Sequence, residues 1–260
     1  MFQVNYGMIF IYATLAFMGC KSRTNRGEVK SVFNEDDRVY WDDLWPTREY
    51  PYHSILWFKG EGSCTAALVS SRLVLTASHC FGDMGSEDVI KVIHQNDDGT
   101  EPWRNARIVA RGAKGMNSGN VGNREDKDWT ILLLDQASPH RPFRVVFFED
   151  DDDVVDRPIS LVGFSSDLRN ASVAQNCAVQ RRSDGVLFHD CDLKAGASGG
   201  PLYFKEPSGD YAIVGVQSTE VLCGNERCAS GVDFSKVMAN RATDTTNFED
   251  EFKELLKKYP

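Results

Sequence analysis

The sequence has little positive charge and no apolar run long enough to cross a membrane as a helix. Its 260 residues contain 38 Asp and Glu against 29 Lys and Arg, a formal net charge of −9. Nucleic acids attract basic surfaces, so this balance argues against a nucleic-acid partner. The apolar run at residues 8–19 is shorter than the roughly 20 residues that span a bilayer. With 42% hydrophobic residues, the chain can still bury a sizeable core.

Signals for a metal site and for internal repeats are also missing. The seven cysteines include no Cys-x-x-Cys pair, which argues against a cysteine-ligated metal. The acidic stretch 149–153 lacks the glycine and the ligand spacing of a calcium loop, and we interpret it as a solvated loop. A calcium site there is the alternative interpretation. We expect no metal and no cofactor.

The first 20 residues have the character of an export signal. The run at 8–19 ends in Gly19-Cys20, which resembles the cleavage box of bacterial lipoproteins. Two features depart from that pattern, because no Lys or Arg precedes the run and Phe17 replaces the usual aliphatic residue. Three outcomes stay open: a lipoprotein acylated on Cys20, an ordinary cleaved signal, and an uncleaved anchor. In the first case membrane attachment would need several acyl chains.

The body of the chain is predicted to consist of short β-strands. After the polar segment 21–36, a linker or removable pro-segment, β-branched and aromatic runs alternate with turn residues from residue 54 onward. These runs are SILWF, TAALV, LVLT, VIKVI, ARIVA, WTILLL, FRVVFF, ISLVGF, CAVQ, GVLFHD, PLYF and YAIVGV. Many strands without intervening helices predict an antiparallel sandwich or barrel.

Two segments depart from the strand pattern. NFEDEFKELLKKY, residues 247–259, has apolar residues at helical spacing, acids in its first turn and lysines in its last. This pattern predicts a C-terminal helix with Asn247 as its N-cap. Residues 112–126 are rich in Gly and Asn, and we interpret them as a long surface loop without a role in a site.

One hydroxyl stands in a glycine-rich turn. LKAGASGGPLYF, residues 193–204, places Ser198 among three glycines, which by itself is also typical of an ordinary turn before a strand. Upstream, His79 ends a β-branched run and Asp128 precedes an apolar strand. His, Asp, Ser is one of the chain orders in which a base, an orienting acid and a nucleophile are found.

These three motifs resemble those of the trypsin-like, chymotrypsin-fold serine proteases. TASHC, KDWTILLLD and AGASGGP stand for the family's TAAHC, its Asp before an apolar strand, and its GDSGGP. CDLKAGASGGP, and DDR followed by EYPYHSI, are similar to the bacterial branch that includes the glutamyl endopeptidases. The resemblance covers residues 36–237. It implies an all-β fold of two antiparallel, Greek-key, six-stranded barrels, with catalytic groups in the cleft between them and a C-terminal α-helix closing the second barrel.

The resemblance also implies a division of the chain. The expected units are a signal at 1–20, a linker or pro-segment at 21–36, an N-terminal barrel at 37–140, a C-terminal barrel at 141–236, and a helix at 237–260.

In the chemistry that this resemblance implies, His79 takes the proton of Ser198 and Asp128 orients the imidazole. The backbone N–H groups of Gly196 and Ser198 form the oxyanion hole. Asp126 is the rival for the acid, but Asp128 directly precedes the apolar strand and is preferred. The expected function is a serine endopeptidase that cleaves polypeptides through an acyl-enzyme, and we expect a monomer.

The cysteines indicate an oxidising compartment. Six cysteines allow fifteen pairings, and the sequence does not choose among them. The family's histidine-loop bridge corresponds to Cys64 and Cys80, and two further pairs suggested beside it are Cys177 with Cys191 and Cys223 with Cys228. Three bridges imply export, so the expected location is secreted, periplasmic or on the outer surface as a lipoprotein.

The specificity residues leave alternatives open. Asp192 stands where trypsin-like enzymes keep the carboxylate that binds a substrate Arg or Lys, which predicts a preference for basic residues; alternatively, it is structural and bound to backbone amides. Gln217 stands where glutamate-specific relatives have a histidine, which weakens the glutamate-specific alternative. Ser218 is expected in the pocket wall beside it.

Three observations bear on maturation and on rival functions. Ala197 replaces the Asp that pairs with a freed N-terminus in trypsin-type zymogens, so we expect a different route of maturation. A catalytically silent binding protein on the same scaffold is the main rival. A lipase or esterase would need a histidine after Ser198, and none follows His189. The remaining histidines, His53, His94, His140 and His189, are expected to be surface or packed residues.

Overall fold

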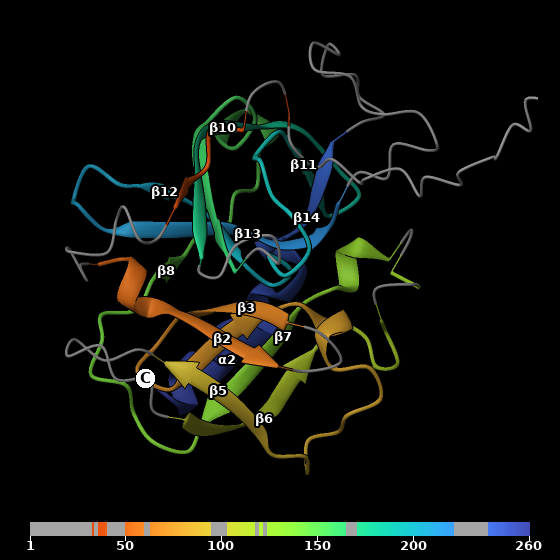
Figure 1. Cartoon of the computed structure of the whole chain (residues 1–260), viewed down its shortest axis with the longest axis vertical. Helices are drawn as coiled ribbons and strands as arrows, with labels where there is room; N and C mark the ends of the chain where they lie inside the picture. Colours follow the sequence, from red (N-terminus) through yellow and green to blue (C-terminus); the bar gives the residue numbers. More distant parts are fainter. Residues whose placement is uncertain are drawn as a thin grey trace, which may run out of the picture.

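The computed structural model describes residues 33, 36–40, 50–59, 63–94, 103–117, 120–121, 124–164, 171–220 and 239–260. These residues form two β-barrels, one above the other in Figure 1, and one α-helix, α2 (Glu249–Lys258). The all-β prediction with two six-stranded barrels and a C-terminal helix is confirmed. Among the described residues, no helix is both long enough and apolar enough to cross a bilayer.

The first barrel is closed by six antiparallel strands. They are β2 (Ile55–Lys59), β3 (Ser63–Leu68), β4 (Leu73–Thr76), β5 (Ile90–His94), β6 (Trp103–Arg111) and β7 (Thr130–Leu134). Around the barrel they run β2-β3-β4-β7-β6-β5, and β5 pairs with β2 to close it. Every residue of β4 and β7 is buried, because these continuous apolar runs form the centre of the core.

The second barrel repeats this strand order. Its strands are β9 (Pro158–Gly163), β10 (Ser172–Ser183), β11 (Val186–His189), β12 (Pro201–Lys205), β13 (Tyr211–Thr219) and β14 (Asn240–Asp244). They run β9-β10-β11-β14-β13-β12, with the β12–β9 pairing closing the ring. Two short strands extend the sheet, β1 (Val39–Tyr40) along β10 and β8 (Arg144–Val145) along β13.

The expected boundaries differ from the structure at both ends of the second barrel. β14 lies beyond residue 236, within the range assigned to the helix, and β1 lies within the range assigned to the first barrel. β14 has the sequence NRATD, and its buried residues include the polar Asn240 and Thr243. Because it contains no apolar run, the sequence pattern did not predict a strand here. The run FRVVFF contributes only β8, which lies outside the barrel.

The C-terminal helix also begins differently from the prediction. A 3-10 turn, Thr245–Phe248, precedes it, and Asp244 caps that turn by accepting a hydrogen bond from the Thr246 N–H. Asn247, the expected cap, instead donates to the Gly185 carbonyl at 2.6 Å. Acids in the first turn and lysines in the last are confirmed.

The helix packs against the first barrel rather than closing the second. Its buried Phe252 joins the core cluster that holds most of the first-barrel side chains. At its end, Ser70 Oγ donates to the Tyr259 carbonyl at 3.1 Å, and Ser71 Oγ to the Pro260 carbonyl at 2.7 Å.

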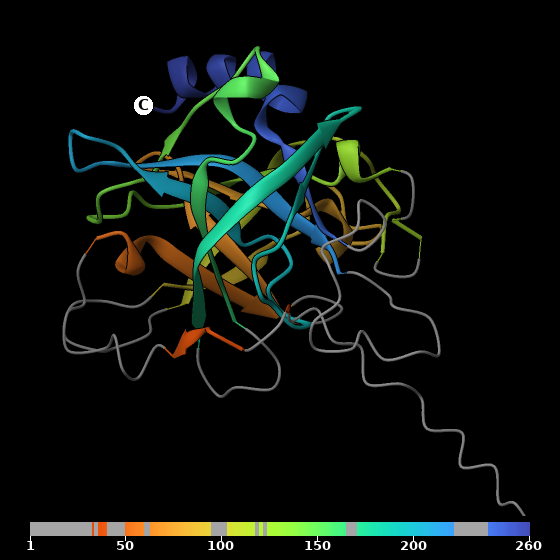
Figure 2. The ribbon, with the colours of Figure 1, turned by 90° about the horizontal axis from the view of Figure 1, so that it is seen from above.

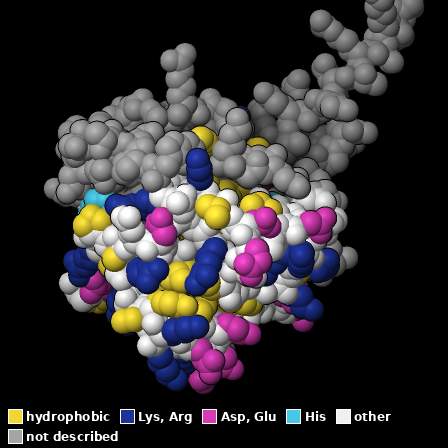
Figure 3. Space-filling model, turned by 90° about the horizontal axis from the view of Figure 1, so that it is seen from below, with side chains coloured by type: hydrophobic (Ala, Val, Ile, Leu, Met, Phe, Trp, Pro, Cys, Tyr) yellow, Lys and Arg dark blue, Asp and Glu magenta, His cyan; other side chains and the backbone are white. Residues whose placement is uncertain are grey.

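Figure 2 shows α2 and β1 on opposite sides of the molecule. In Figure 3, which views the molecule from the side of the first barrel, basic and acidic side chains are mixed around a small apolar patch.

Two disulfides reinforce the barrels. They join Cys64 to Cys80 and Cys177 to Cys191, the pairs expected for these four cysteines. Cys223, Cys228 and Cys20 lie outside the described residues.

Candidate active site

His79 and Asp128 leave neighbouring strands at the same end of the first barrel. β4 and β7 are paired so that Thr76 lies opposite Thr130. His79 follows β4 in the 3-10 turn Ser78–Cys80, and Asp128 lies two residues before Thr130. The register of two adjacent strands therefore brings together residues that are 49 positions apart.

The Asp128 carboxylate holds His79 through two hydrogen bonds. His79 Nδ1 lies 2.7 Å from Asp128 Oδ2, and the His79 N–H donates to Oδ1 at 2.8 Å. Ser218 Oγ, from β13 of the second barrel, donates to Oδ2 at 2.5 Å. Asp128 is fully buried, so these contacts replace its hydration. An Nδ1 proton facing Asp128 leaves Nε2 as the acceptor nitrogen of His79.

The loop before Asp128 is clamped by the second barrel. Glu125, in the 3-10 turn Glu125–Lys127, is 3% exposed and forms an ion pair with Arg241 of β14 at 2.6 Å. The single O–H of Thr243 Oγ1 lies within hydrogen-bond distance of two carbonyls, that of Glu125 (2.5 Å) and that of Asp128 (3.1 Å). The interpretation of 112–126 as a surface loop without a role is therefore wrong for its end at Glu125. Because β14 gives no strand signal, the sequence could not indicate this clamp.

The turn that carries Ser198 is fixed between the barrels. Thr65 of β3 donates its N–H to the Ser198 carbonyl at 2.8 Å, and the Gly199 N–H donates to the Gln217 carbonyl at 2.8 Å. Gly199 has φ +78°, and a Cβ there would clash with Thr76 Oγ1 and lie 2.9 Å from the Ala77 N. The turn thus packs on the chain two residues before His79, which brings the serine turn and the histidine turn together.

The expected oxyanion-hole residues lie in the same turn. Gly196 has φ +100°, a conformation that favours glycine, and its carbonyl accepts a hydrogen bond from Thr65 Oγ1 at 2.9 Å. Among the described residues, no protein acceptor receives the N–H of Gly196 or of Ser198. Ala197 is buried against Gly163, where a Cβ would lie 2.6 Å from the Ala197 Cβ.

Gln217, which precedes Ser218 in β13, forms a buried hydrogen bond with His189. His189 Nε2 lies 2.8 Å from Gln217 Oε1, and His189 Nδ1 accepts the Cys191 N–H at 3.3 Å. The proton therefore sits on Nε2. Burial lowers the pKa of His189 to about 4, so the ring is neutral near pH 7. The other end of Gln217 donates to the Thr219 carbonyl at 3.1 Å. The sequence placed His189 only among surface or packed residues.

Asp192 is occupied by the amino-terminal part of the chain. Its Oδ1 accepts the Phe33 N–H at 2.6 Å and its Oδ2 accepts the Asp37 N–H at 3.3 Å. Burial raises the pKa of Asp192 to about 6, an effect that these two hydrogen bonds partly oppose. The residue is 5% exposed.

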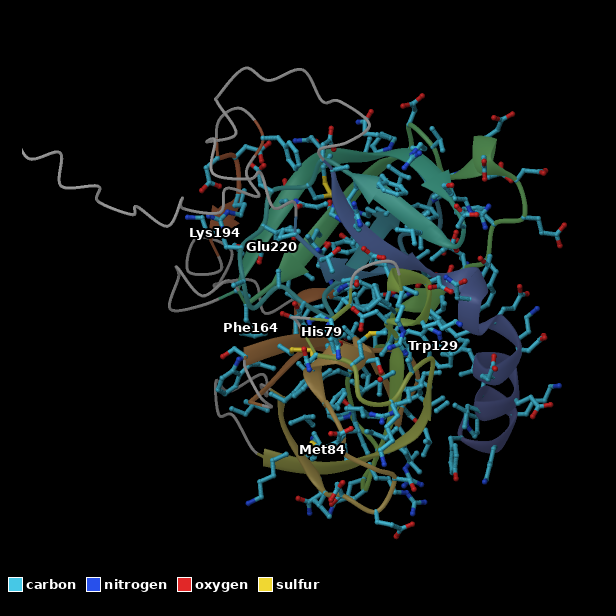
Figure 4. All side chains as sticks on the ribbon, turned by 90° about the vertical axis from the view of Figure 1, so that its right-hand side faces the viewer. His79, Met84, Trp129, Phe164, Lys194 and Glu220 are labelled. Carbon is cyan, nitrogen blue, oxygen red and sulfur yellow. A yellow bond between two sulfur atoms is a disulfide. The ribbon has the colours of Figure 1, made fainter. Side chains whose placement is uncertain are left out.

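In Figure 4, Phe164 and His79 lie where the barrels meet, with Lys194 and Glu220 on the side of the second barrel.

The described residues offer no ready metal site near His79. The one group of potential ligands whose atoms lie within 4.8 Å of one another is Cys64, His79 and Cys80. Its two sulfurs are joined in a disulfide and cannot act as thiolate ligands.

Comparisons with known proteins identify the family and the fold. Residues 64–215 match the family described as the trypsin-like peptidase domain. A solved structure of a Glu endopeptidase in complex with MPD is similar to the chain, with a TM-score of 0.59 and 20% sequence identity. The similarity covers 87% of this chain and 99% of that one. At this identity it indicates a shared fold. No curated protein matches the sequence.

Proposed function

This chain belongs to the trypsin-like peptidase family and is a serine endopeptidase, and from that premise we propose that His79, Asp128 and Ser198 form its catalytic triad. The single observation that carries the proposal is the Asp128 carboxylate, which binds the Nδ1 and N–H groups of His79 while it is fully buried. This arrangement leaves Nε2 as the basic nitrogen of His79, and the turn of Ser198 packs on the chain two residues before that histidine.

In the proposed reaction, Ser198 Oγ attacks the carbonyl carbon of the scissile peptide bond. Its proton passes to His79 Nε2 as the O–C bond forms, and the imidazolium is stabilised by Asp128. The same proton then goes to the leaving amine as the C–N bond breaks, which yields an acyl-enzyme. Water then gives a proton to His79 Nε2 as its oxygen attacks the acyl carbon. His79 passes that proton to Ser198 Oγ as the ester C–O bond breaks, which releases the acid and restores the enzyme.

The proposed oxyanion hole consists of the N–H groups of Gly196 and Ser198. The negative charge that develops on the substrate oxygen would accept both hydrogen bonds, and loss of one such donor typically raises the barrier by roughly 3 kcal/mol. Support comes from the turn itself, because Thr65 fixes the Gly196 carbonyl from the other barrel.

Labelling with a fluorophosphonate tests the triad directly. We expect the folded wild-type chain to be labelled on Ser198, and Ser198→Ala and His79→Ala to remain unlabelled. A folded, mature wild-type chain that does not react would support the rival function, a silent binding protein on the same scaffold.

Substrate preference is the finer part of the proposal. A preference for basic residues before the cut requires that Asp192 be accessible to the substrate side chain, and its hydrogen bonds to Phe33 and Asp37 favour the structural alternative. Gln217 carries a neutral amide whose oxygen is engaged by His189, which gives no cationic group for a substrate glutamate. A peptide library that varies the residue before the cut decides among these preferences, and cleavage after Glu alone would overturn the basic one.

We further propose that the enzyme is exported, as a secreted protein or a surface lipoprotein acylated on Cys20, and that it acts as a monomer. The two disulfides support an oxidising compartment. The intact mass of the mature protein would report cleavage, acylation and the number of cystines together. A mature chain that retains residues 1–20 without acylation would contradict both forms of processing.

A further inference from the structure

A short amino-terminal segment is attached to the second barrel at two places. β1 pairs with β10, with Val39 opposite Val173. Earlier in the segment, the N–H groups of Phe33 and Asp37 each donate to a different oxygen of Asp192, 159 and 155 positions further along the chain. Both oxygens of one carboxylate are thus engaged by backbone donors.

Asp192 itself stands at a fixed point of the chain. The residue before it, Cys191, is joined to Cys177 of β10 by a disulfide, and its carbonyl accepts a hydrogen bond from Asn240 Nδ2 at 2.9 Å. From this point the chain runs six residues to Ser198. A contact at Asp192 therefore acts on the start of the segment that presents the nucleophile.

The hydrogen bonds of Asp192, and not the charges around it, argue against this residue as the receptor for a cation. The Arg38 guanidinium is committed to Asp36, with contacts of 2.7 and 2.8 Å. The carboxylates of Asp36 and Asp37 raise the pKa of Asp192 further, beyond the larger effect of burial. Each carboxylate oxygen has two lone pairs, so a substrate guanidinium or ammonium group at Asp192 would have to share these oxygens with any donor already bound there. Here both oxygens already accept hydrogen bonds.

We propose that Asp192 is a positioning residue that binds the backbone of the chain's own amino-terminal segment, and that this contact, and not a substrate side chain, occupies its carboxylate. The segment then orders the stretch between Cys191 and Ser198. This inference rests on the proposed function, because it assigns Asp192 a role toward the nucleophile. In trypsin-type zymogens an Asp at the position of Ala197 pairs with the freed N-terminus. Ala197 has no carboxylate, and in the proposal the carboxylate of Asp192 binds the amino-terminal segment instead.

The contact itself is tested by amide hydrogen exchange in the full chain. Asp192→Ala removes both acceptors, and we expect the Phe33 and Asp37 amides to exchange roughly 10- to 100-fold faster, the range for hydrogen bonds to a charged group. Asp190→Asn is the matched control, because Asp190 binds the Ala178 N–H (2.7 Å) and Gln180 Nε2 (2.8 Å) within the second barrel. Unchanged exchange in Asp192→Ala would overturn the proposal.

A second pair of variants removes the donor instead of the acceptor. Phe33→Pro deletes the N–H that binds Asp192, whereas Phe33→Ala keeps it and changes only the side chain. We expect Phe33→Pro to lower kcat/KM as Asp192→Ala does but by less, because the Asp37 N–H still binds the carboxylate. The double variant should lose no more than Asp192→Ala alone. This pair keeps the proposal testable if Asp192→Ala does not fold. Full additivity would show that the two groups act independently and would contradict it.

Kinetics on peptides with Arg, Lys, Glu or Phe before the cut separates positioning from substrate binding. A positioning role predicts that Asp192→Ala lowers kcat/KM for all four peptides by a similar factor, with Asp192→Asn, which keeps one acceptor oxygen, partly restoring it. A loss of about 100-fold confined to Arg and Lys would overturn the proposal and make Asp192 the receptor. If the wild type cleaves no peptide, the proposed function fails, and the exchange measurement still decides whether Asp192 binds the segment.

Discussion

The two barrels share one strand order but differ in what they bury. In the first, the buried strand residues are almost all apolar, and two of the buried polar ones, Thr65 and Thr76, contact the turn of Ser198 in the second barrel. In the second, buried polar residues continue into the strands, including His189, Gln217, Asn240 and Thr243. Each of these four has a hydrogen-bond partner.

This difference matches the groups of the proposed site that each barrel carries. In the proposed triad, the apolar first barrel holds the base, His79, and the acid, Asp128, next to neighbouring strands. The second barrel carries the turn of the proposed nucleophile, Ser198, and Ser218, which donates a hydrogen bond to Asp128. Buried polar networks specify one arrangement only when every member is satisfied, so the second barrel is the more sensitive half.

The largest effect should follow from removing one group from each barrel. We expect Ser198→Ala and His79→Ala each to lower kcat by roughly a million-fold, and the double variant to lose no more, because the residues act as one unit. Steady-state kinetics on a peptide amide measures this, with circular dichroism as the check on folding. Losses that add would contradict a shared proton relay.

The contact between the barrels at the nucleophile turn gives the next largest effect. Gly199→Ala should destabilise the protein by at least about 3 kcal/mol, because φ is positive and the new Cβ clashes with Thr76 Oγ1 and the Thr65 carbonyl. Gly209→Ala is the control: φ is also positive there, but nothing lies within 4 Å of the new Cβ, so about 1 kcal/mol is expected. Equal losses in urea denaturation would show that the turn is not packed on the first barrel.

The polar interior of the second barrel should appear as acid sensitivity. His189 has a folded pKa of about 4, below its ordinary value of 6.5, so its contribution to stability is complete above pH 6.5 and is lost as the pH falls to 4. That contribution is about 3 kcal/mol. Urea denaturation between pH 7 and 4 should show this loss in the wild type and a smaller one in His189→Gln. Parallel curves for the two proteins would contradict the assignment.

The clamp between the barrels should have the smallest effect. Arg241→Met leaves Glu125 buried without its partner, and we expect a loss of about 1–2 kcal/mol, moderated because the Arg241 side chain is 40% exposed. The double variant with Glu125→Gln removes the unpaired charge and should recover part of that stability. Because Asp128 follows Glu125 closely, kcat should fall more in Arg241→Met than in the double variant. An unchanged kcat in both variants would show that the Glu125–Arg241 ion pair does not affect the position of Asp128.

Much of the fold and of the candidate triad could be predicted because their signals are local. Continuous apolar runs indicated the strands of the first barrel, and the short motifs around His79, Asp128 and Ser198 identified those residues as candidates. β14 was not predicted because three of its four buried residues, Asn240, Thr243 and Asp244, are polar and form hydrogen bonds with residues far along the chain. The Glu125–Arg241 pair and the His189–Gln217 contact were not predicted either, because the residues next to a side chain in the sequence do not indicate its partner in the tertiary structure.

The sequence by itself determined the fold class, the order of the chemical groups and the compartment that its cysteines favour, because periodicity and short motifs are properties of neighbouring residues. It showed no internal repeat, although the two barrels follow the same strand order. Only the tertiary structure decided which acid meets His79, what occupies Asp192, and which polar residues a barrel can bury. Those outcomes depend on tertiary packing, which brings together residues 28 positions apart, as in the contact of His189 with Gln217, and 159 positions apart, as in the contact of Phe33 with Asp192.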